Sequence, residues 1–297
     1  MRQFTGCGTA LVTSFRDDAD QSVDEEALRA LVERQIVAGV DFLVPCGTTG
    51  ESPTLSHEEH RRVIGIVIDQ AAGRVPIMAG TGSNSTREAV SLTEHAQRAG
   101  AAAVLAVVPY YNKPPQRGMV RYFTAIADVG LPVYGYNIPG RTGVNMLPET
   151  LAQMSGHPNF AGNKEATGNL EQMTQDIILC DQGMIFLCGD DTLTLPLMVL
   201  GGHGVISVVS NLIPAEITEL VHAALAGNWD RARELHLRHF PLAKAMFCET
   251  NPIPVKWACA AMGLLTPVWR SPMVPPTQAQ MAIIRAEMEK AGLDPVL

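Results

Sequence analysis

The chain has 297 residues, enough for one large α/β domain or two ordinary ones, and its hydrophobic content of 46% can fill a sizeable core. Aromatic residues make up only 5%, and the net charge of −8 arises from interspersed acidic and basic residues without a basic run. This composition argues against nucleic acid or an anionic membrane as the main partner.

Short apolar runs alternate along the chain with longer amphipathic segments, which is the pattern expected for strands separated by helices. The first amphipathic segment has Ser22 as a candidate N-cap, acidic residues in its first turn and Gly39 just beyond its end. The predicted strands span residues 8–15, 41–47, 75–82, 102–111, 131–139, 159–165, 184–191 and 203–211, and the clearest helices span 22–39, 56–73, 84–100, 145–156 and 167–183.

Strands without polar alternation are typical of a parallel sheet that helices cover on its outer face. Eight such β-then-α units, about 30 residues apart, predict an α/β fold of the closed (β/α)8 TIM-barrel class. An open doubly wound sheet is the alternative, although no G-x-G-x-x-G motif opens a helix after the first strand. Three more helical segments follow, so we expect a barrel over residues 1–226 and a C-terminal three-helix extension over 227–297, packed on the barrel.

Neither a secretory signal nor a metal site is evident. The first ten residues have no apolar segment, and no window approaches 18 uninterrupted apolar residues, so we expect a cytoplasmic protein. The six cysteines form no C-x-x-C pair or Cys/His cluster, which indicates reduced thiols. Arg61 replaces the second histidine of a zinc motif in HEEHR, and His57 and His60 lie either on a solvated helix face or in a binding site.

Lys164 is the candidate nucleophile. In a TIM barrel, catalytic side chains lie at the C-terminal ends of the strands. The chain has five lysines against 17 arginines, and only Lys164 is predicted to point from a barrel strand toward the mouth. Lys256 is placed on an amphipathic helix outside the barrel. Apolar walls and a nearby Arg141 would lower the pKa of the Lys164 amine and make it nucleophilic.

The neighbouring segments supply groups that imine chemistry on a 2-oxo acid requires. Tyr136 on the adjacent strand can exchange protons, with Thr48 and Tyr111 as hydroxyls that relay them. Thr49 and its backbone can bind one carboxylate. Arg141 can hold a second carboxylate as a bidentate fork. Each residue alone is equally well explained as part of a turn or a helix cap, and their convergence on one mouth favours a catalytic site.

Eight motifs then reveal a resemblance that runs from about residue 4 to the C-terminus: GTTGES, AGTGSN, PYYNKP, YNIPGRTG, KEATGN, GDD, GGHGVISV and NPIPVKWA. Together they closely resemble the dihydrodipicolinate synthase family of pyruvate-dependent class I aldolases, which includes N-acetylneuraminate lyase. The resemblance implies a Schiff-base-forming lyase that condenses pyruvate with L-aspartate 4-semialdehyde and cyclises the product, on the route to diaminopimelate and lysine. It also implies a homotetramer built as a dimer of dimers and feedback inhibition by L-lysine. The imine scheme itself requires no metal, and we expect no cofactor.

The resemblance assigns roles position by position. Lys164 matches the imine-forming lysine, Tyr136 the proton shuttle, and Thr48 and Tyr111 its relay partners, with Tyr111 reaching in from a neighbouring subunit. Thr49 matches the residue that holds the pyruvate carboxylate, and Arg141 the one that binds the semialdehyde carboxylate. The remaining positions are Gly189 and Ile206, which line the site through their backbones, and the allosteric L-lysine site formed by Ser52, His57, His60, Asn84, Glu88 and Tyr110.

Two other functions fit parts of the pattern. A sister aldolase acting on a 2-keto-3-deoxy sugar acid, N-acetylneuraminate or 4-hydroxy-2-oxoglutarate would keep Lys164 and Tyr136 but need a different aldehyde pocket. Arg141 and Tyr111 favour the synthase. A non-catalytic barrel that only binds a metabolite would form no pyruvate imine.

Two residues depart from the usual family pattern. Asn163 precedes the lysine where an apolar residue is common, and a polar side chain there needs a partner. Gly140 replaces a common serine in the arginine loop.

Overall fold

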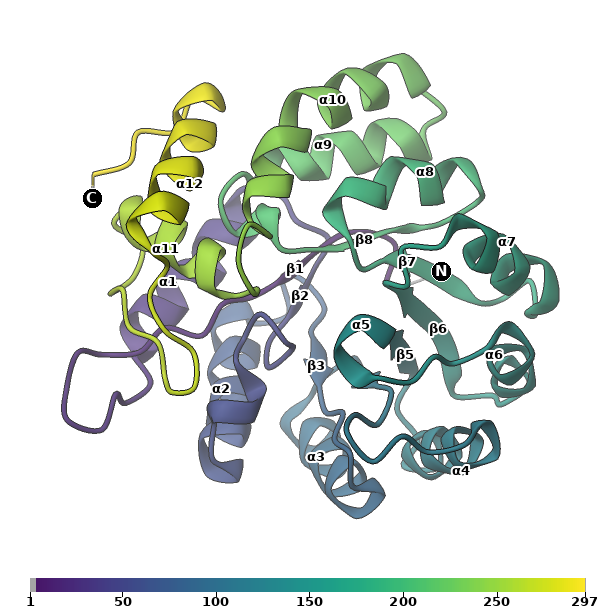
Figure 1. Cartoon of the computed structure of the whole chain (residues 1–297). Helices are drawn as coiled ribbons and strands as arrows, with labels where there is room; N and C mark the ends of the chain where they lie inside the picture. The colour runs from purple at the N-terminus through teal and green to yellow at the C-terminus, as the bar shows by residue number, and fades with distance from the viewer. Residues whose placement is uncertain (1–3, 297) are drawn as a thin grey trace.

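Residues 4–296, which the computed structural model describes, form a ring of parallel strands surrounded by helices (Figure 1). The strand order is β2-β1-β8-β7-β6-β5-β4-β3, and a parallel bridge between Leu43 and Ile77 joins the two ends of the sheet. The predicted TIM barrel is therefore confirmed. Its strands are β1 (Gly6–Ala10), β2 (Phe42–Val44), β3 (Met78–Gly80), β4 (Ala103–Val107), β5 (Val133–Asn137), β6 (Phe160–Glu165), β7 (Ile185–Cys188) and β8 (Gly204–Ser207).

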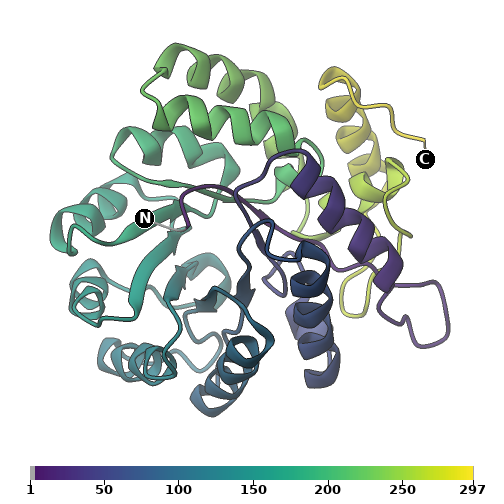
Figure 2. The same ribbon diagram turned by 180° about the vertical axis from the view of Figure 1, so that it is seen from behind.

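The helices lie outside the ring, and the last three form the predicted C-terminal extension on one side of it (Figures 1 and 2). In this extension α10 packs along α9, and α12 contacts both α10 and α11. The division of the chain into two units after residue 226 stays a prediction. The helices are α1 (Glu25–Val37), α2 (His57–Ala71), α3 (Thr86–Ala99), α4 (Gln116–Ala127), α5 (Pro139–Thr142), α6 (Pro148–Ser155), α7 (Leu170–Leu179), α8 (Thr194–Val199), α9 (Pro214–Leu225), α10 (Trp229–Ala245), α11 (Ile253–Ala261) and α12 (Gln278–Lys290), with short 3₁₀ turns η1 (Ser52–Thr54), η2 (Asp191–Leu193) and η3 (Val209–Asn211).

Capping residues fix where the first two helices begin. Ser56 caps α2 as part of a full capping box with Glu59, where the sequence placed the start of this helix. Ser22 does not cap α1, because the chain is still extended at the bridge between Phe15 and Val23. Asp24 takes that role and accepts a hydrogen bond from the backbone of Ala27.

The observed strands end earlier than the sequence predicted. The predicted strand 102–111 ends as β4 at Val107, and 8–15 is β1 only from Gly8 to Ala10. The predicted strand 41–47 likewise ends as β2 at Val44. The residues beyond β2 and β4 resemble strand residues in type, but they lie in loops where Cys46 and Tyr111 adopt left-handed backbone angles (φ 55° and 71°). These loops therefore build the mouth of the barrel.

Side chains fill the interior of the ring, so the barrel is a packed core and not a pore. Phe42, Met78, Leu105 and Leu187 belong to one buried cluster that also contains Tyr136. Two larger apolar clusters separate the strands from the surrounding helices. Within the described part of the chain, no helix combines the length and apolar character needed to cross a membrane.

Candidate active site

Lys164 and Tyr136 lie side by side at the mouth of the barrel. They pair in register on β6 and β5, each is only 5% exposed, and the Lys164 amine lies 4.3 Å from the centroid of the Tyr136 ring. Burial lowers the pKa of Lys164 to about 8; the charge of Asp191 opposes this shift and the Arg141 guanidinium adds to it. The neutral amine, which is the form that attacks carbonyl groups, is thus far more populated at neutral pH than in an ordinary lysine.

Tyr136 keeps its proton and has a neighbour to which it can pass it. Burial raises the pKa of the phenol to about 12, although the charge of Arg141 and a hydrogen bond with Thr48 both oppose the shift. Thr48 lies in the loop that follows β2. The pair therefore forms a proton path that begins beside the Lys164 amine and leads toward the β2 loop.

A third residue, Asn251, joins the two carboxylate-binding candidates. Its side-chain amide donates a hydrogen bond of 3.1 Å to the Thr49 hydroxyl, and its backbone carbonyl accepts one of 2.9 Å from the Arg141 guanidinium. Thr49 is buried, whereas Arg141 is exposed on the four-residue helix α5. The sequence analysis did not identify Asn251, although it opens the NPIPVKWA motif. Two groups that can bind carboxylates are thus held at the mouth by the C-terminal segment.

Gly189 and Ile206 line the site in different ways. A Cβ atom at Gly189 would lie 3.0 Å from Cε of Lys164 and 2.8 Å from Cβ of Ala166, so a larger residue would collide with the amine-bearing side chain. Ile206 on β8 is fully buried in the same interior cluster as Tyr136. The first position leaves space for the lysine, and the second belongs to the apolar interior of the barrel.

Tyr111 does not reach this site within its own chain. It is 88% exposed, its backbone is left-handed, and its amide donates to the Thr142 carbonyl at 3.3 Å. The described part of its own chain therefore covers little of this aromatic residue. The single chain therefore gathers Thr48, Tyr136 and Lys164 but leaves the fourth predicted catalytic residue outside.

The residues predicted to bind L-lysine surround a separate cavity of about 180 Å³. His57 pairs with Glu88, which also accepts from Ser83. His60 is buried, its ring nitrogen lies 2.8 Å from the Gly80 carbonyl, and burial lowers its pKa. Of the two predicted histidines, only His57 therefore lies on a solvated helix face. The predicted residues that line the cavity are Ser52, His57, His60, Glu88 and Tyr110, while Asn84 lies next to it and its carbonyl accepts from Asn112.

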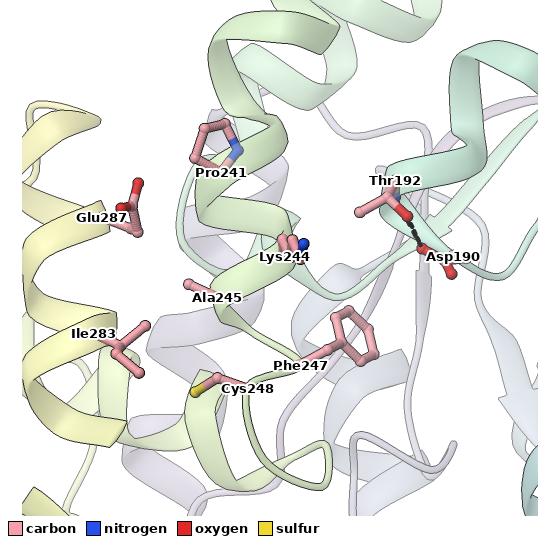
Figure 3. Close-up of a pocket in the computed structure, with 9 residues that line it drawn as sticks. All are labelled: Asp190, Thr192, Pro241, Lys244, Ala245, Phe247, Cys248, Ile283 and Glu287. Carbon is pink, nitrogen blue, oxygen red and sulfur yellow. Dashed lines mark hydrogen bonds between the residues drawn. The ribbon is translucent and has the colours of Figure 1, made fainter. Parts of the chain in front are cut away.

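A larger cavity of about 570 Å³ opens between α10, α12 and η2 (Figure 3). Asp190 and Thr192 form one wall and follow Gly189 directly in the chain. Lys244 and Phe247 from the C-terminal extension lie on another part of the lining. This cavity therefore borders the loop that carries Gly189, on the side of the extension.

The structure corrects one lysine assignment. Lys256 does lie on a helix outside the barrel strands, but this helix, α11, is not amphipathic: it is buried along its whole length, and the Lys256 side chain is fully buried with it. It forms an ion pair with Glu51 of the GTTGES segment. Both residues occur in recognised motifs, but no local pattern indicates that positions 205 residues apart meet.

The two departures from the family pattern have different surroundings. Asn163 is fully buried; its amide donates to Glu165 at 3.1 Å, and its carbonyl oxygen has no partner among the described residues. Its need for a partner is thus only half met. A Cβ at Gly140 would meet no atom within 4 Å, so the space at this position does not require glycine.

The comparisons with known proteins agree along nearly the whole chain. A model of the dihydrodipicolinate synthetase family matches residues 3–291. Proteins named 4-hydroxy-tetrahydrodipicolinate synthase from Citrifermentans bemidjiense and Syntrophus aciditrophicus are 51% and 52% identical over 291 residues, which is 98% of this chain and 99% of each relative.

Solved structures agree equally well. The crystal structure of dihydrodipicolinate synthase from Aquifex aeolicus has a TM-score of 0.96 at 43% identity, and that of the Cyanidioschyzon merolae enzyme with lysine bound has 0.93 at 40%. Each match covers 98% of this chain and 99% of the other. The chain therefore belongs to the dihydrodipicolinate synthetase family.

Proposed function

We propose that this chain is a 4-hydroxy-tetrahydrodipicolinate synthase that joins pyruvate to L-aspartate 4-semialdehyde through an imine on Lys164. The observation that carries the proposal is the buried Lys164 amine, with its lowered pKa, beside the Tyr136 phenol. Relatives about 50% identical over the full chain carry this name. The alternative sister aldolases share the lysine and the tyrosine, and Arg141 at the mouth favours a substrate with a second carboxylate.

In the first half of the reaction, the neutral Lys164 amine attacks C2 of pyruvate while Thr49 holds the carboxylate. Tyr136 gives a proton to the oxygen that departs as water, and the product is the protonated imine. The Tyr136–Thr48 relay, which has given up one proton, accepts a proton from C3; this converts the imine to an enamine, and the positive nitrogen takes up the electron pair. Thr48 offers Tyr136 a route to recover its proton.

In the second half, C3 of the enamine attacks the aldehyde carbon of the semialdehyde, whose carboxylate Arg141 binds. The new hydroxyl receives its proton from the Tyr136 relay. The amino group of the semialdehyde then attacks C2 and displaces the Lys164 amine, which closes the ring and frees the enzyme. The ring atoms and both carboxylates of 4-hydroxy-tetrahydrodipicolinate are thus accounted for without a cofactor in the sequence of steps.

The test of this function is pyruvate consumption by the purified chain, with L-aspartate 4-semialdehyde in one series and other aldehydes in parallel. We expect rapid consumption only with the semialdehyde. Consumption with a different aldehyde would assign the chain to the sister aldolases. No consumption with any aldehyde, together with no borohydride-trapped pyruvate, would favour a barrel that binds without turnover.

The lowered pKa of Lys164 predicts how imine formation depends on pH. Below pH 8 the amine is mainly charged, so the initial rate of borohydride-trapped imine formation should rise about tenfold from pH 6 to pH 7 and level off above about 8. Rapid mixing with pyruvate, followed at set times by quenching into borohydride, measures this rate as the amount of trapped imine. An amine with an ordinary pKa would instead show a rate that still climbs tenfold between pH 8 and pH 9.

We also propose that Tyr111 completes the proton relay of a neighbouring subunit in a homotetramer. Its exposure and its position outside its own site support this assignment. Sedimentation velocity should give a tetramer, and Tyr111→Phe should lower turnover without preventing assembly. A fully active monomer would contradict the shared relay.

L-lysine should inhibit the enzyme through the cavity that contains Glu88. The Glu88 carboxylate can pair with the ligand's ammonium group, and Glu88→Gln should raise the half-inhibitory lysine concentration by at least about tenfold, because a hydrogen bond to a charged group is lost. Glu94→Gln, an exposed change on the same helix, is the matched control. Unchanged turnover at saturating L-lysine would reject the regulatory site.

A further inference from the structure

A buried ion pair connects the C-terminal extension to the loop that follows β2. Nζ of Lys256 on α11 lies 2.5 Å from Oε1 of Glu51, and the two side chains are 0% and 1% exposed. The same amine lies 4.3 Å from the centroid of the Phe15 ring. Burial lowers the pKa of Lys256, and the Glu51 charge opposes that shift. Because desolvation largely offsets the attraction in such a pair, stability alone explains it poorly.

The backbone of Glu51 shows what the ion pair holds in place. Glu51 has a left-handed φ of 53°, and Cys46 at the other end of the loop has 55°. Residues other than glycine keep such angles only where surrounding contacts impose them. The Glu51 amide donates to the Thr48 carbonyl at 3.1 Å. A shift of Glu51 would therefore be transmitted directly to Thr48.

Thr48 and Thr49 depend on the extension to different degrees. Thr49 has its own contact with the extension, through the Asn251 amide at 3.1 Å. Among residues 4–296, no hydrogen bond joins Thr48 to the extension, and Thr48 is the residue that hydrogen-bonds Tyr136. Loss of the ion pair should therefore disturb the proton path more than the pyruvate-carboxylate site.

We infer that Lys256 is a positioning residue which, through Glu51, fixes the loop 46–51 so that Thr48 stays in contact with the Tyr136 phenol. The C-terminal extension thereby sets the rate of proton transfer at a site whose reacting groups all come from the barrel. This inference rests on the proposed function, because it assigns the proton path to that reaction.

The test is the variant Lys256→Met, which keeps the length of the side chain and removes the charge. We expect kcat to fall about 30-fold, within the loss that small misplacements of catalytic groups produce. The KM for pyruvate should change less than threefold, and borohydride should still trap pyruvate completely on Lys164. Exchange of the pyruvate methyl protons in D₂O, which needs no second substrate, should slow by a factor similar to that for kcat.

Two further variants separate positioning from simple stabilisation. The double variant Lys256→Met with Glu51→Gln removes both buried charges, so its Tm should be higher than that of Lys256→Met while its kcat stays low. If Lys256→Met does not fold, the kcat of the double variant tests the inference instead. Arg270→Met is the matched control, because Arg270 also stacks on Phe15, at 4.2 Å, but its 2.5 Å ion pair is with Glu59 of α2. It should lower Tm and leave kcat within threefold.

Three results would overturn the inference: a kcat of folded Lys256→Met within threefold of the wild type, recovery of kcat together with Tm in the double variant, or an equal loss of kcat in Arg270→Met. Failure of the proposed function has a different signature. In that case the wild type would not use the semialdehyde. The rate of methyl-proton exchange in Lys256→Met, compared with the wild type, would then test the role of Lys256 without the second substrate.

Discussion

Lys164→Ala should abolish borohydride trapping of pyruvate and reduce condensation to the uncatalysed level, a loss of at least about 10⁴-fold. The Lys164 amine is the only protein atom that bonds covalently to pyruvate in the proposed reaction, and a hydroxyl cannot replace a nitrogen nucleophile in forming an imine. Mass spectrometry of the trapped protein, combined with the coupled pyruvate assay, measures both losses. Lys290→Ala, which removes an exposed amine paired with Glu287, is the control and should retain both activities.

The same lysine should reduce the stability of the folded chain. Its pKa falls from 10.5 to about 8 on folding. Below pH 8 the amine is charged in both the folded and the unfolded state, so the full cost of burying the charge applies. Above about pH 10.5 it is neutral in both states and the cost disappears. Lys164→Met should therefore raise the unfolding free energy at pH 7 by up to about 3 kcal/mol, and Tm should rise with it.

Two outcomes would contradict this assignment. Pyruvate trapped on another lysine in Lys164→Ala would show that Lys164 is not the nucleophile. A lower Tm for Lys164→Met, in a protein with unchanged circular dichroism, would mean that the amine is not buried at a net cost.

Arg141→Ala should leave imine formation intact and remove the use of the second substrate. Arg141 is exposed at the mouth, and the Asn251 carbonyl orients its guanidinium, so it can reach an incoming carboxylate. We expect kcat/KM for the semialdehyde to fall about 10³-fold, equivalent to about 4 kcal/mol, while trapping of pyruvate remains complete. Steady-state kinetics with each substrate varied in turn measures the difference.

Two controls make the Arg141 result specific. Arg141→Lys keeps the charge but loses the planar fork, and should fall between the wild type and the alanine variant. Arg121→Ala, an exposed change on α4, should behave as the wild type. Equal loss of trapping and condensation in Arg141→Ala would mean that the residue supports the fold of the loop or binds pyruvate itself.

Much of the site was accessible from sequence because it depends on order along the chain. Alternating apolar and amphipathic segments predict eight β-then-α units, and a closed barrel of such units brings the ends of all its strands to one mouth. Lys164 and Tyr136 are therefore predicted to lie on neighbouring strands, which the register of β5 and β6 bears out. The Ser56 cap of α2 was predictable for a similar reason, since its contacts lie within three residues.

Other features depended on contacts that no local pattern encodes. The pairing of Lys256 with Glu51 and the hydrogen bond of Asn251 to Thr49 each join residues more than 200 positions apart, once α11 has docked on the barrel. The outward direction of Tyr111 and the burial of His60 likewise follow from how loops and helices pack. Sequence by itself determined the fold and the chemical groups, because periodicity and strand order are local properties of the chain. Only the tertiary structure decided which groups are buried and held together, because burial and hydrogen-bond geometry arise from the packing of distant segments.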